Sequence, residues 1–139
     1  MSTGPTEQRN AYKGRPPRPW LRLHFAAPDG SEQELDLVAD TGNPSAVIIS
    51  PARMNQLKYA DAPSLSTNFG PLTGGWVQLS MPEFGLVQGV LAYASDPVVR
   101  AAKASSPDFE GLLGLPLLRL VEYGGDANGF WIRTPSGTP

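Results

Sequence analysis

The triplet Asp40-Thr41-Gly42 is the part of the sequence whose residue types and order could do chemistry. The apolar pair Val38-Ala39 leads into it, so a carboxylate follows directly on a predicted strand and precedes a glycine. A strand end on a rigid scaffold presents side chains to a cleft, and glycine allows another backbone to approach closely. A carboxylate in such a place can act as a general acid or base. The alternative is a turn in which Asp40 accepts a hydrogen bond from its own backbone.

Other catalytic and metal-binding chemistries have few residues to draw on. The 139 residues include no Cys and one His, which excludes disulfides, thiol catalysis, Cys-ligated metals and a multi-His metal site within one chain. His24 alternates with apolar residues, which predicts an exposed position on the polar face of a strand. The chain has no phosphate-binding glycine motif and no Gly-x-Ser-x-Gly sequence. We therefore expect no metal and no cofactor.

Charge and hydropathy bear on partners and location. The formal net charge is −2 at pH 7, and the basic residues cluster only in the first part of the chain, which disfavours nucleic acid as a partner. No apolar run is long enough to span a membrane, and no signal-peptide pattern opens the sequence. We therefore expect no membrane insertion and a cytoplasmic location.

The elements that would position Asp40 are predicted to be short strands. Gly and Pro number 15 each, together about a fifth of the chain, which is typical of a turn-rich, mainly β fold with two or three short helices. Alternating apolar residues predict a hairpin of 20–25 and 32–39. Further strands are predicted at 47–49, 76–81, 86–94, 109–114 and 130–132, a turn-rich stretch at 67–75, and helices opening at Ser50-Pro51, over 96–103 and over 116–120.

The two ends of the chain are predicted to lie outside the folded unit. Residues 1–19 are rich in Pro, Gly and basic residues and have few large apolar side chains. Such a segment buries too little apolar surface to offset the entropy of ordering, so we expect a flexible, solvated arm. Residues 20–134 are expected to form one domain, and residues 135–139 a short C-terminal tail.

Three features in this order resemble the retroviral-type aspartic peptidases, the retropepsins, and their single-domain bacterial relatives. The apolar pair and Asp40-Thr41-Gly42 come first, a glycine-rich turn follows, and Leu112-Leu113-Gly114 then leads directly into a predicted helix. The resemblance covers about residues 20–133 and implies a single-lobe, closed β fold of the acid-protease type. Two positions depart from the family pattern: Asn43 stands where retroviral members usually have Ala or Ser, and Leu115 where they usually have Asn or Asp.

The resemblance also implies a role for each site residue. Asp40 would be catalytic, Thr41 would join two active-site loops through its hydroxyl, and Gly42 would bond the substrate backbone. The implied residues are, for the active-site loop, Thr41, Gly42 and Asn43; for a mobile flap, Gly70, Gly74, Gly75 and Trp76; and for structural support beneath the loop, Leu112, Leu113 and Gly114.

Peptide hydrolysis by this class needs two carboxylates that share one proton. The chain has one such triplet. Asp36 would lie about 13 Å from Asp40 along the strand, too far to share a proton, and we expect it to take a solvated or edge position. A complete site would need two chains, with Asp40 of each meeting on a twofold axis. The sequence therefore predicts a homodimeric aspartic endopeptidase that hydrolyses peptides or proteins with an acidic pH optimum.

Two other functions stay open. The same fold could be catalytically silent and serve as a dimerisation or peptide-binding module that grips an extended chain by strand addition. The triplet could also be a chance turn in a β-rich interaction domain.

Overall fold

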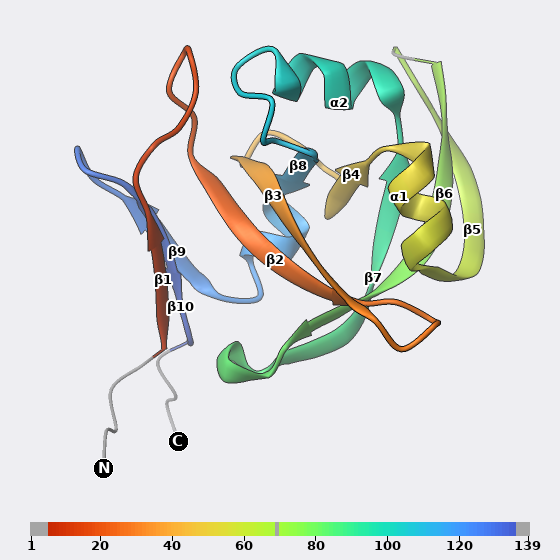
Figure 1. The fold of residues 1–139 in the computed structure, drawn as a ribbon, viewed down its shortest axis with the longest axis horizontal. Coiled ribbons are helices and arrows are strands. Elements are labelled where there is room, and N and C mark those ends of the chain that lie inside the picture. Colours follow the sequence, from red (N-terminus) through yellow and green to blue (C-terminus); the bar gives the residue numbers. More distant parts are fainter. Residues whose placement is uncertain (1–5, 69, 136–139) are drawn as a thin grey trace.

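The computed structural model describes residues 6–68 and 70–135, and Figure 1 shows a mainly β fold. Residues 1–5 of the predicted arm, Phe69 of the predicted turn-rich stretch 67–75 and residues 136–139 of the predicted tail lie outside the described part. The described strands are β1 (Glu7–Asn10), β2 (Trp20–Ala26), β3 (Glu32–Asp40), β4 (Val47–Ile49), β5 (Lys58–Thr67), β6 (Gly70–Met81), β7 (Leu86–Ala94), β8 (Gly111–Gly114), β9 (Glu122–Gly125) and β10 (Phe130–Arg133). The described helices are α1 (Pro51–Leu57), α2 (Asp96–Lys103), α3 (Leu115–Leu118) and the 3-10 helix η1 (Pro82–Phe84). The predicted mainly β class is confirmed, and the described ranges hold three short α-helices where two or three were predicted.

Six of the described strands close into a barrel. Their hydrogen-bonded order is β2-β3-β8-β4-β7-β6, and the end of β2 pairs with β6 to complete the circle. The predicted hairpin is present as β2 and β3, with Leu21 opposite Leu37 and Leu23 opposite Leu35. These four side chains are fully buried, because every second residue of each strand points into the barrel. β5 lies outside the circle and pairs with β6.

β8 lies between β3 and β4, parallel to β3 and antiparallel to β4. Asp40, the last residue of β3, is opposite Gly114, the last residue of β8. The loop that joins β3 to β4 must therefore cross the end of β8. This crossing brings together the Asp-Thr-Gly triplet and the Leu-Leu-Gly segment, which are far apart in the sequence.

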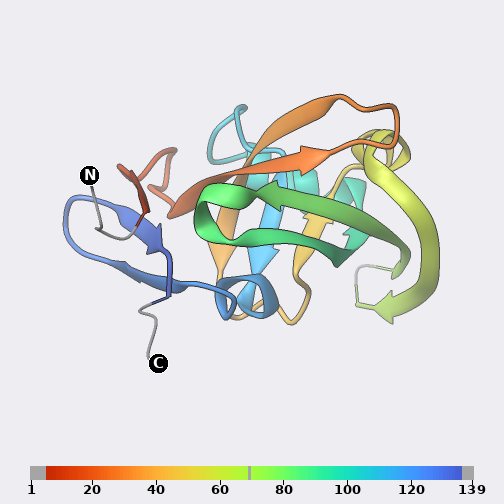
Figure 2. The same cartoon turned by 90° about the horizontal axis from the view of Figure 1, so that it is seen from below.

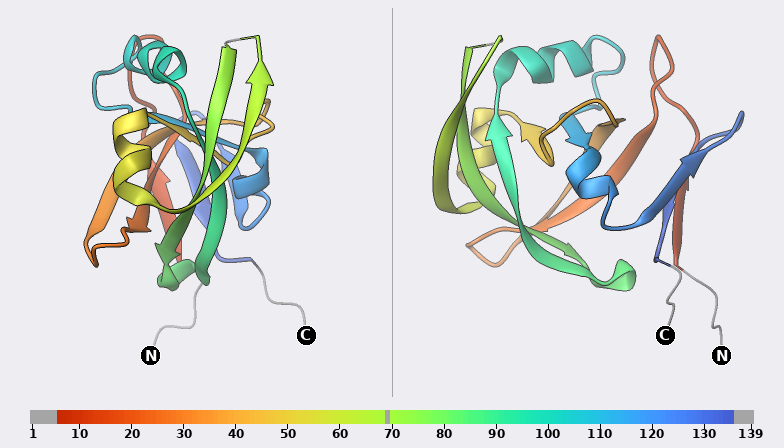
Figure 3. Two further views of the ribbon diagram at one scale, coloured as in Figure 1. Left: turned by 90° about the vertical axis from the view of Figure 1, so that its right-hand side faces the viewer. Right: turned by 180° about the vertical axis from the view of Figure 1, so that it is seen from behind.

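A serine caps the N-terminus of each of the two longer helices, α1 and α2. Ser50 accepts a 3.1 Å hydrogen bond from the Arg53 N–H at the start of α1, and Ser95 accepts one of 3.3 Å from the Val98 N–H at the start of α2. Each is followed by proline in the first turn, where a missing N–H costs nothing. α2 packs across β8 and β4, and the β5–β6 hairpin rises beside it toward the same end of the molecule (Figures 1 and 3). None of the helices in the described ranges is long and apolar enough to cross a membrane.

The expectation of a solvated arm over residues 1–19 is wrong for the part that the structure describes. β1 pairs with β10, which pairs with β9, and the three form a small sheet beside the barrel (Figure 2). Lys13 and Arg18 then exchange backbone hydrogen bonds of 3.1 and 2.8 Å, and the Trp20 indole donates one of 2.8 Å to the Ala11 carbonyl. β1 and β10 stand near opposite ends of the chain, so local composition could not predict their pairing.

Candidate active site

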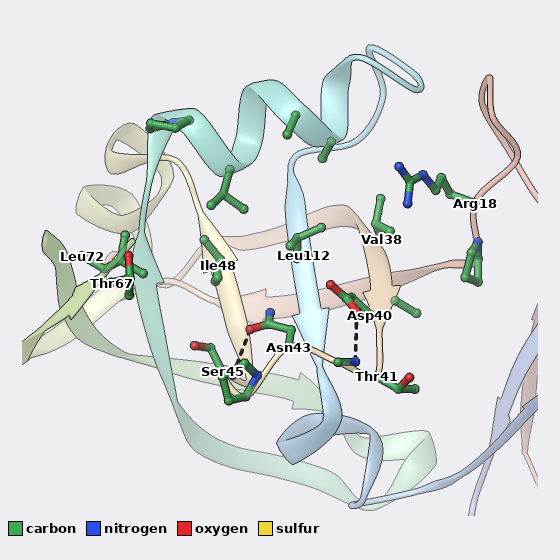
Figure 4. A pocket seen from close by; sticks show the side chains of 18 of the residues that line it. Arg18, Val38, Asp40, Thr41, Asn43, Ser45, Ile48, Thr67, Leu72 and Leu112 are labelled. Carbon is green, nitrogen blue, oxygen red and sulfur yellow. Dashed lines mark hydrogen bonds between the residues drawn. The ribbon is translucent and has the colours of Figure 1, made fainter. Parts of the chain in front are cut away.

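Asp40 closes β3, and its side chain is exposed. Figure 4 shows its Oδ1 accepting a hydrogen bond from the Gly42 N–H, at 3.0 Å, and its carbonyl oxygen accepts another of 3.0 Å from the Asn43 N–H. The turn in which Asp40 caps its own backbone is therefore present, and this turn orients the carboxylate. No group among the described residues donates to Oδ2. That oxygen is free to meet a water molecule, a ligand or a second carboxyl group.

Gly114, predicted to support the loop, lies directly beneath it. Its N–H donates to the Ala46 carbonyl at 3.0 Å, and the Leu115 N–H donates to the Asn43 carbonyl at 3.2 Å. A Cβ on Gly114 would overlap the carbonyl oxygens of Asn43 and Ser45. Glycine therefore allows the loop and β8 to pack this closely.

The two leucines of the same segment face different ways. Leu113 is fully buried and belongs to the barrel core. Leu112 is half-buried and lines the pocket in front of Asp40. Leu113 thus stabilises the strand under the loop, and Leu112 shapes the surface that a ligand would contact.

The three residues after Asp40 differ in exposure. Thr41 and Gly42 are exposed, whereas Asn43 is 8% exposed. The Asn43 Oδ1 accepts a 3.0 Å hydrogen bond from the Ser45 N–H (Figure 4), but its Nδ2 is enclosed and finds no acceptor in the described chain. The loop presents Thr41 and Gly42 outward and keeps Asn43 inside.

Asp40 opens onto a pocket of about 770 Å³, within the usual size range of ligand sites. Among its lining residues Asp40 is the single acid and Arg18 the single base. Most of the apolar lining comes from three parts of the fold: Val38, Ile48 and Leu112 from the barrel strands; Pro97, Val98, Ala101 and Ala102 from α2; and Leu65 and Leu72 from the β5–β6 hairpin. Pro19 and Phe130 add to it from outside these parts, and Figure 4 shows Val38, Ile48, Leu72 and Leu112 around the space. The pocket is an apolar trough with one carboxylate at its edge.

The predicted flap glycines are not all at a hairpin tip. The hairpin turns between Thr67 and Gly70, which pair with each other. Gly74 and Gly75 are buried inside β6, paired on both sides by β5 and β7. Trp76 is 38% exposed and does not line the pocket. The prediction of a glycine-rich turn through Gly75 is therefore wrong, because β6 begins at Gly70 and forms an antiparallel pair with β5.

The hairpin residues that line the pocket are Leu65, Thr67, Asn68 and Leu72. The last three lie within the predicted turn-rich stretch 67–75 but were not among the predicted site residues, and Leu65 lies outside that stretch. Pro63 and the scarcity of large apolar residues argue against a strand over 58–67. β5 is an edge strand, where proline is tolerated. The signal that the sequence offers for this turn is the glycine at position 70. In the structure Gly70 has a φ of 91°, which favours glycine. Arg18 was missed as well, because it was assigned to the solvated arm.

Asp36 is not the solvated carboxylate that we expected. Its side chain is 13% exposed, and it accepts hydrogen bonds from Arg22 at 2.8 and 3.2 Å and from the Lys13 ammonium at 3.2 Å. Burial alone would raise the pKa of Asp36, but the hydrogen bonds and positive charges of Arg22 and Lys13 outweigh it and lower the pKa. Asp36 is thus committed to an ion-pair cluster, and the acid that lines the pocket is Asp40 alone.

Metal-binding and other titratable groups are sparse around the pocket. In residues 6–68 and 70–135, no three His, Cys, Asp or Glu side chains gather closely enough to hold a metal ion. His24 is half-buried on β2 rather than fully exposed, with its Nδ1 3.8 Å from a Glu34 oxygen. The fold and the pocket define a closed β barrel that carries one oriented carboxylate beside an apolar trough. Comparisons with protein-family models, with curated proteins and with solved structures gave no match.

Proposed function

We propose that this chain is a retropepsin-type aspartic endopeptidase that works as a homodimer. One observation carries the proposal: Asp40 stands at the edge of an apolar pocket, with one carboxylate oxygen held by the Gly42 N–H and the other without a donor in the described chain. A carboxylate oriented in advance is suited to proton transfer. The pairing of β3 with β8 supports the family resemblance, since it places Asp40 against Gly114, the end of the Leu-Leu-Gly segment.

In the proposed dimer, the Asp40 carboxyl groups of the two chains share one proton. The ionised carboxylate takes a proton from a water molecule, and the water oxygen attacks the carbonyl carbon of the peptide bond. The protonated carboxyl gives its proton to the carbonyl oxygen, which yields a gem-diol. A gem-diol hydroxyl then returns a proton to the pair while the first carboxyl protonates the amide nitrogen, and the C–N bond breaks. The pair again holds one proton.

An extended peptide is the substrate class that suits the pocket. Leu65 and Leu72 of the hairpin and Val38 and Leu112 of the barrel give apolar surface on different sides of the trough. Such walls favour apolar side chains next to the cleaved bond. The exposed Thr41 lies beside Asp40 on the outside of the loop, where the loop of a second copy could reach its hydroxyl.

The test is hydrolysis of a denatured protein, with products identified by mass spectrometry between about pH 4 and about pH 8. We expect cleavage, fastest at acidic pH, and a loss of about 10³-fold or more in Asp40→Asn with an unchanged circular dichroism spectrum. The matched control is Asp29→Asn, since the Asp29 Oδ1 accepts a 2.9 Å hydrogen bond from the Ser31 N–H in a turn of the same kind. This control should keep full activity.

Two results would count against the peptidase. Equal cleavage by the wild type and Asp40→Asn would remove Asp40 from the chemistry. Peptide binding by both forms, with cleavage by neither, would favour the catalytically silent binding module in its place.

A further inference from the structure

Arg18 is a cation on the wall of the Asp40 pocket that no other function of the fold accounts for. It comes from the segment between β1 and β2, and Figure 4 shows its side chain extending toward Val38 and the space above Asp40. In the described residues no carboxylate pairs with Arg18. Four arginines pair with an acid, namely Arg9, Arg22, Arg53 and Arg133. Of the remaining arginines, Arg18 is the one that lines the pocket.

The backbone around Arg18 is fastened to the site. The Ala39 N–H, one residue before Asp40, donates to the Pro19 carbonyl at 2.9 Å, and Arg18 exchanges backbone hydrogen bonds with Lys13. The Arg18 Nε donates to the Ser105 hydroxyl at 3.3 Å. This bond uses the inner nitrogen of the guanidinium, and the two terminal nitrogens have no acceptor in the described chain.

We infer that Arg18 selects substrates with an acidic side chain to one side of the cleaved bond; this rests on the proposed peptidase function and specifies its substrate class. Two free terminal nitrogens match the two oxygens of a carboxylate, which is the strongest partner for a guanidinium fork. The apolar lining next to Arg18, such as Val38, strengthens that attraction relative to open water. The same charge repels a substrate that places Lys or Arg there.

The other lining residues of the trough further define which peptides should be preferred. Arg18 is the single basic residue among the lining residues, and the pocket otherwise offers mostly apolar side chains. The preferred peptide therefore carries apolar residues in the trough and one Glu or Asp where it passes Arg18. A peptide with Gln in place of this Glu has a side chain of the same length and lacks only the negative charge.

The experiment compares fluorogenic peptides that differ by Glu, Gln or Lys at each position around the cleaved bond. It is run at about pH 6, where the glutamate is ionised. We expect the wild type to favour Glu over Gln by about tenfold in kcat/KM at one position. Arg18→Gln should remove this preference, Arg18→Lys should retain part of it, and Arg18→Glu should favour Lys. Arg15→Gln is the matched control from the same segment, since Arg15 does not line the pocket, and it should keep the wild-type preference.

A binding assay separates failure of this inference from failure of the peptidase. The same peptides are titrated into the Asp40→Asn protein by fluorescence anisotropy. Binding that favours Glu in an Arg18-dependent way, with no cleavage by the wild type, would retain Arg18 as the selector and remove the peptidase. Cleavage without an acidic preference would overturn the role of Arg18 and leave the peptidase in place. An equal loss for all peptides in Arg18→Gln, accompanied by dissociation of the dimer, would also overturn it. Absence of both binding and cleavage would overturn both.

Discussion

At the scale of single residues, the Asn43 amide is the buried group in the Asp40 loop whose hydrogen bonding is incomplete. Its oxygen accepts from the Ser45 N–H, while its nitrogen is enclosed with no acceptor among residues 6–68 and 70–135. Leaving a buried donor unsatisfied costs about 1–3 kcal/mol. Where the retroviral-type peptidases that the sequence resembles usually have Ala or Ser, this chain therefore keeps a polar group that the described part of its fold does not satisfy, next to the proposed catalytic carboxylate.

Asn43→Asp tests whether the side chain at position 43 is shielded from water. The new carboxyl keeps an acceptor for the Ser45 N–H but places a second oxygen where the amide nitrogen is enclosed. Burial disfavours the charged form, so the folded state binds the proton more tightly than the unfolded state. We expect a loss of about 1–3 kcal/mol in unfolding free energy at about pH 7 that shrinks below about pH 4.

Urea denaturation at the two pH values measures this difference. Asn68→Asp, an exposed amide on the same pocket, is the matched control and should change stability little at either pH. A loss in Asn43→Asp that is the same at both pH values would mean that the new carboxyl is solvated.

At the scale of elements, Asp36 joins three parts of the chain. It lies on β3, bonds Arg22 on β2 and holds Lys13 of the segment that carries Arg18. The Lys13 ammonium also lies 3.8 Å from the centre of the Trp20 ring. Asp36 thus helps to fix the segment that forms one wall of the pocket.

The stability difference between the wild type and Asp36→Asn should depend on pH. The pKa of Asp36 is lowered in the fold, so its contribution is present above the unfolded value of about 4 and is lost as pH falls through the folded value. We expect the variant to be less stable than the wild type by about 1–2 kcal/mol at pH 7. The expected loss is this small because Arg22 is half-exposed and water screens its attraction to Asp36. The gap to the wild type should narrow at about pH 3.

Denaturation at the two pH values measures that gap, and hydrogen exchange should report faster opening of residues 11–19 in the variant. Asp61→Asn removes a carboxylate that pairs with Lys58 at 2.8 Å but is 83% exposed, so it should leave stability nearly unchanged. A constant gap from neutral to acidic pH would contradict the role given to Asp36.

The elements that the sequence predicts are those whose signals are local. Alternating apolar residues located β2 and β3, and the prolines near the helix starts, in Ser50-Pro51 and Asp96-Pro97, located α1 and α2. β1, β9 and β5 carry weak local signals, because they are polar or contain proline and are held by pairing with other strands. For the site, Asp40 and Gly114 could be singled out, whereas the pocket walls contributed by Arg18 and the β5–β6 hairpin depend on these long-range pairings.

At the scale of the whole molecule, each chain presents one proposed catalytic carboxylate at its surface. The terminal strands β1 and β10 of the described chain pair with each other in one small sheet. The exposed residues Thr41 and Gly42 lie next to Asp40. The proposed contact between copies therefore centres on the Asp40 loops, and activity has to depend on both partners.

Mixing of subunits tests this dependence. If two chains form each site, adding an equal amount of Asp40→Asn protein and allowing exchange should lower the peptidase activity of a fixed amount of wild type to about half, because a quarter of twice as many dimers remain fully wild type. A larger excess should lower it further. Initial rates on one peptide, at a protein concentration where sedimentation shows dimers, measure the effect. Asp29→Asn protein retains Asp40 and should instead raise the rate about twofold at equal amounts. Wild-type activity that does not change as Asp40→Asn protein is added would mean that each chain acts alone, and a single Asp40 could not then share its proton with a symmetry mate.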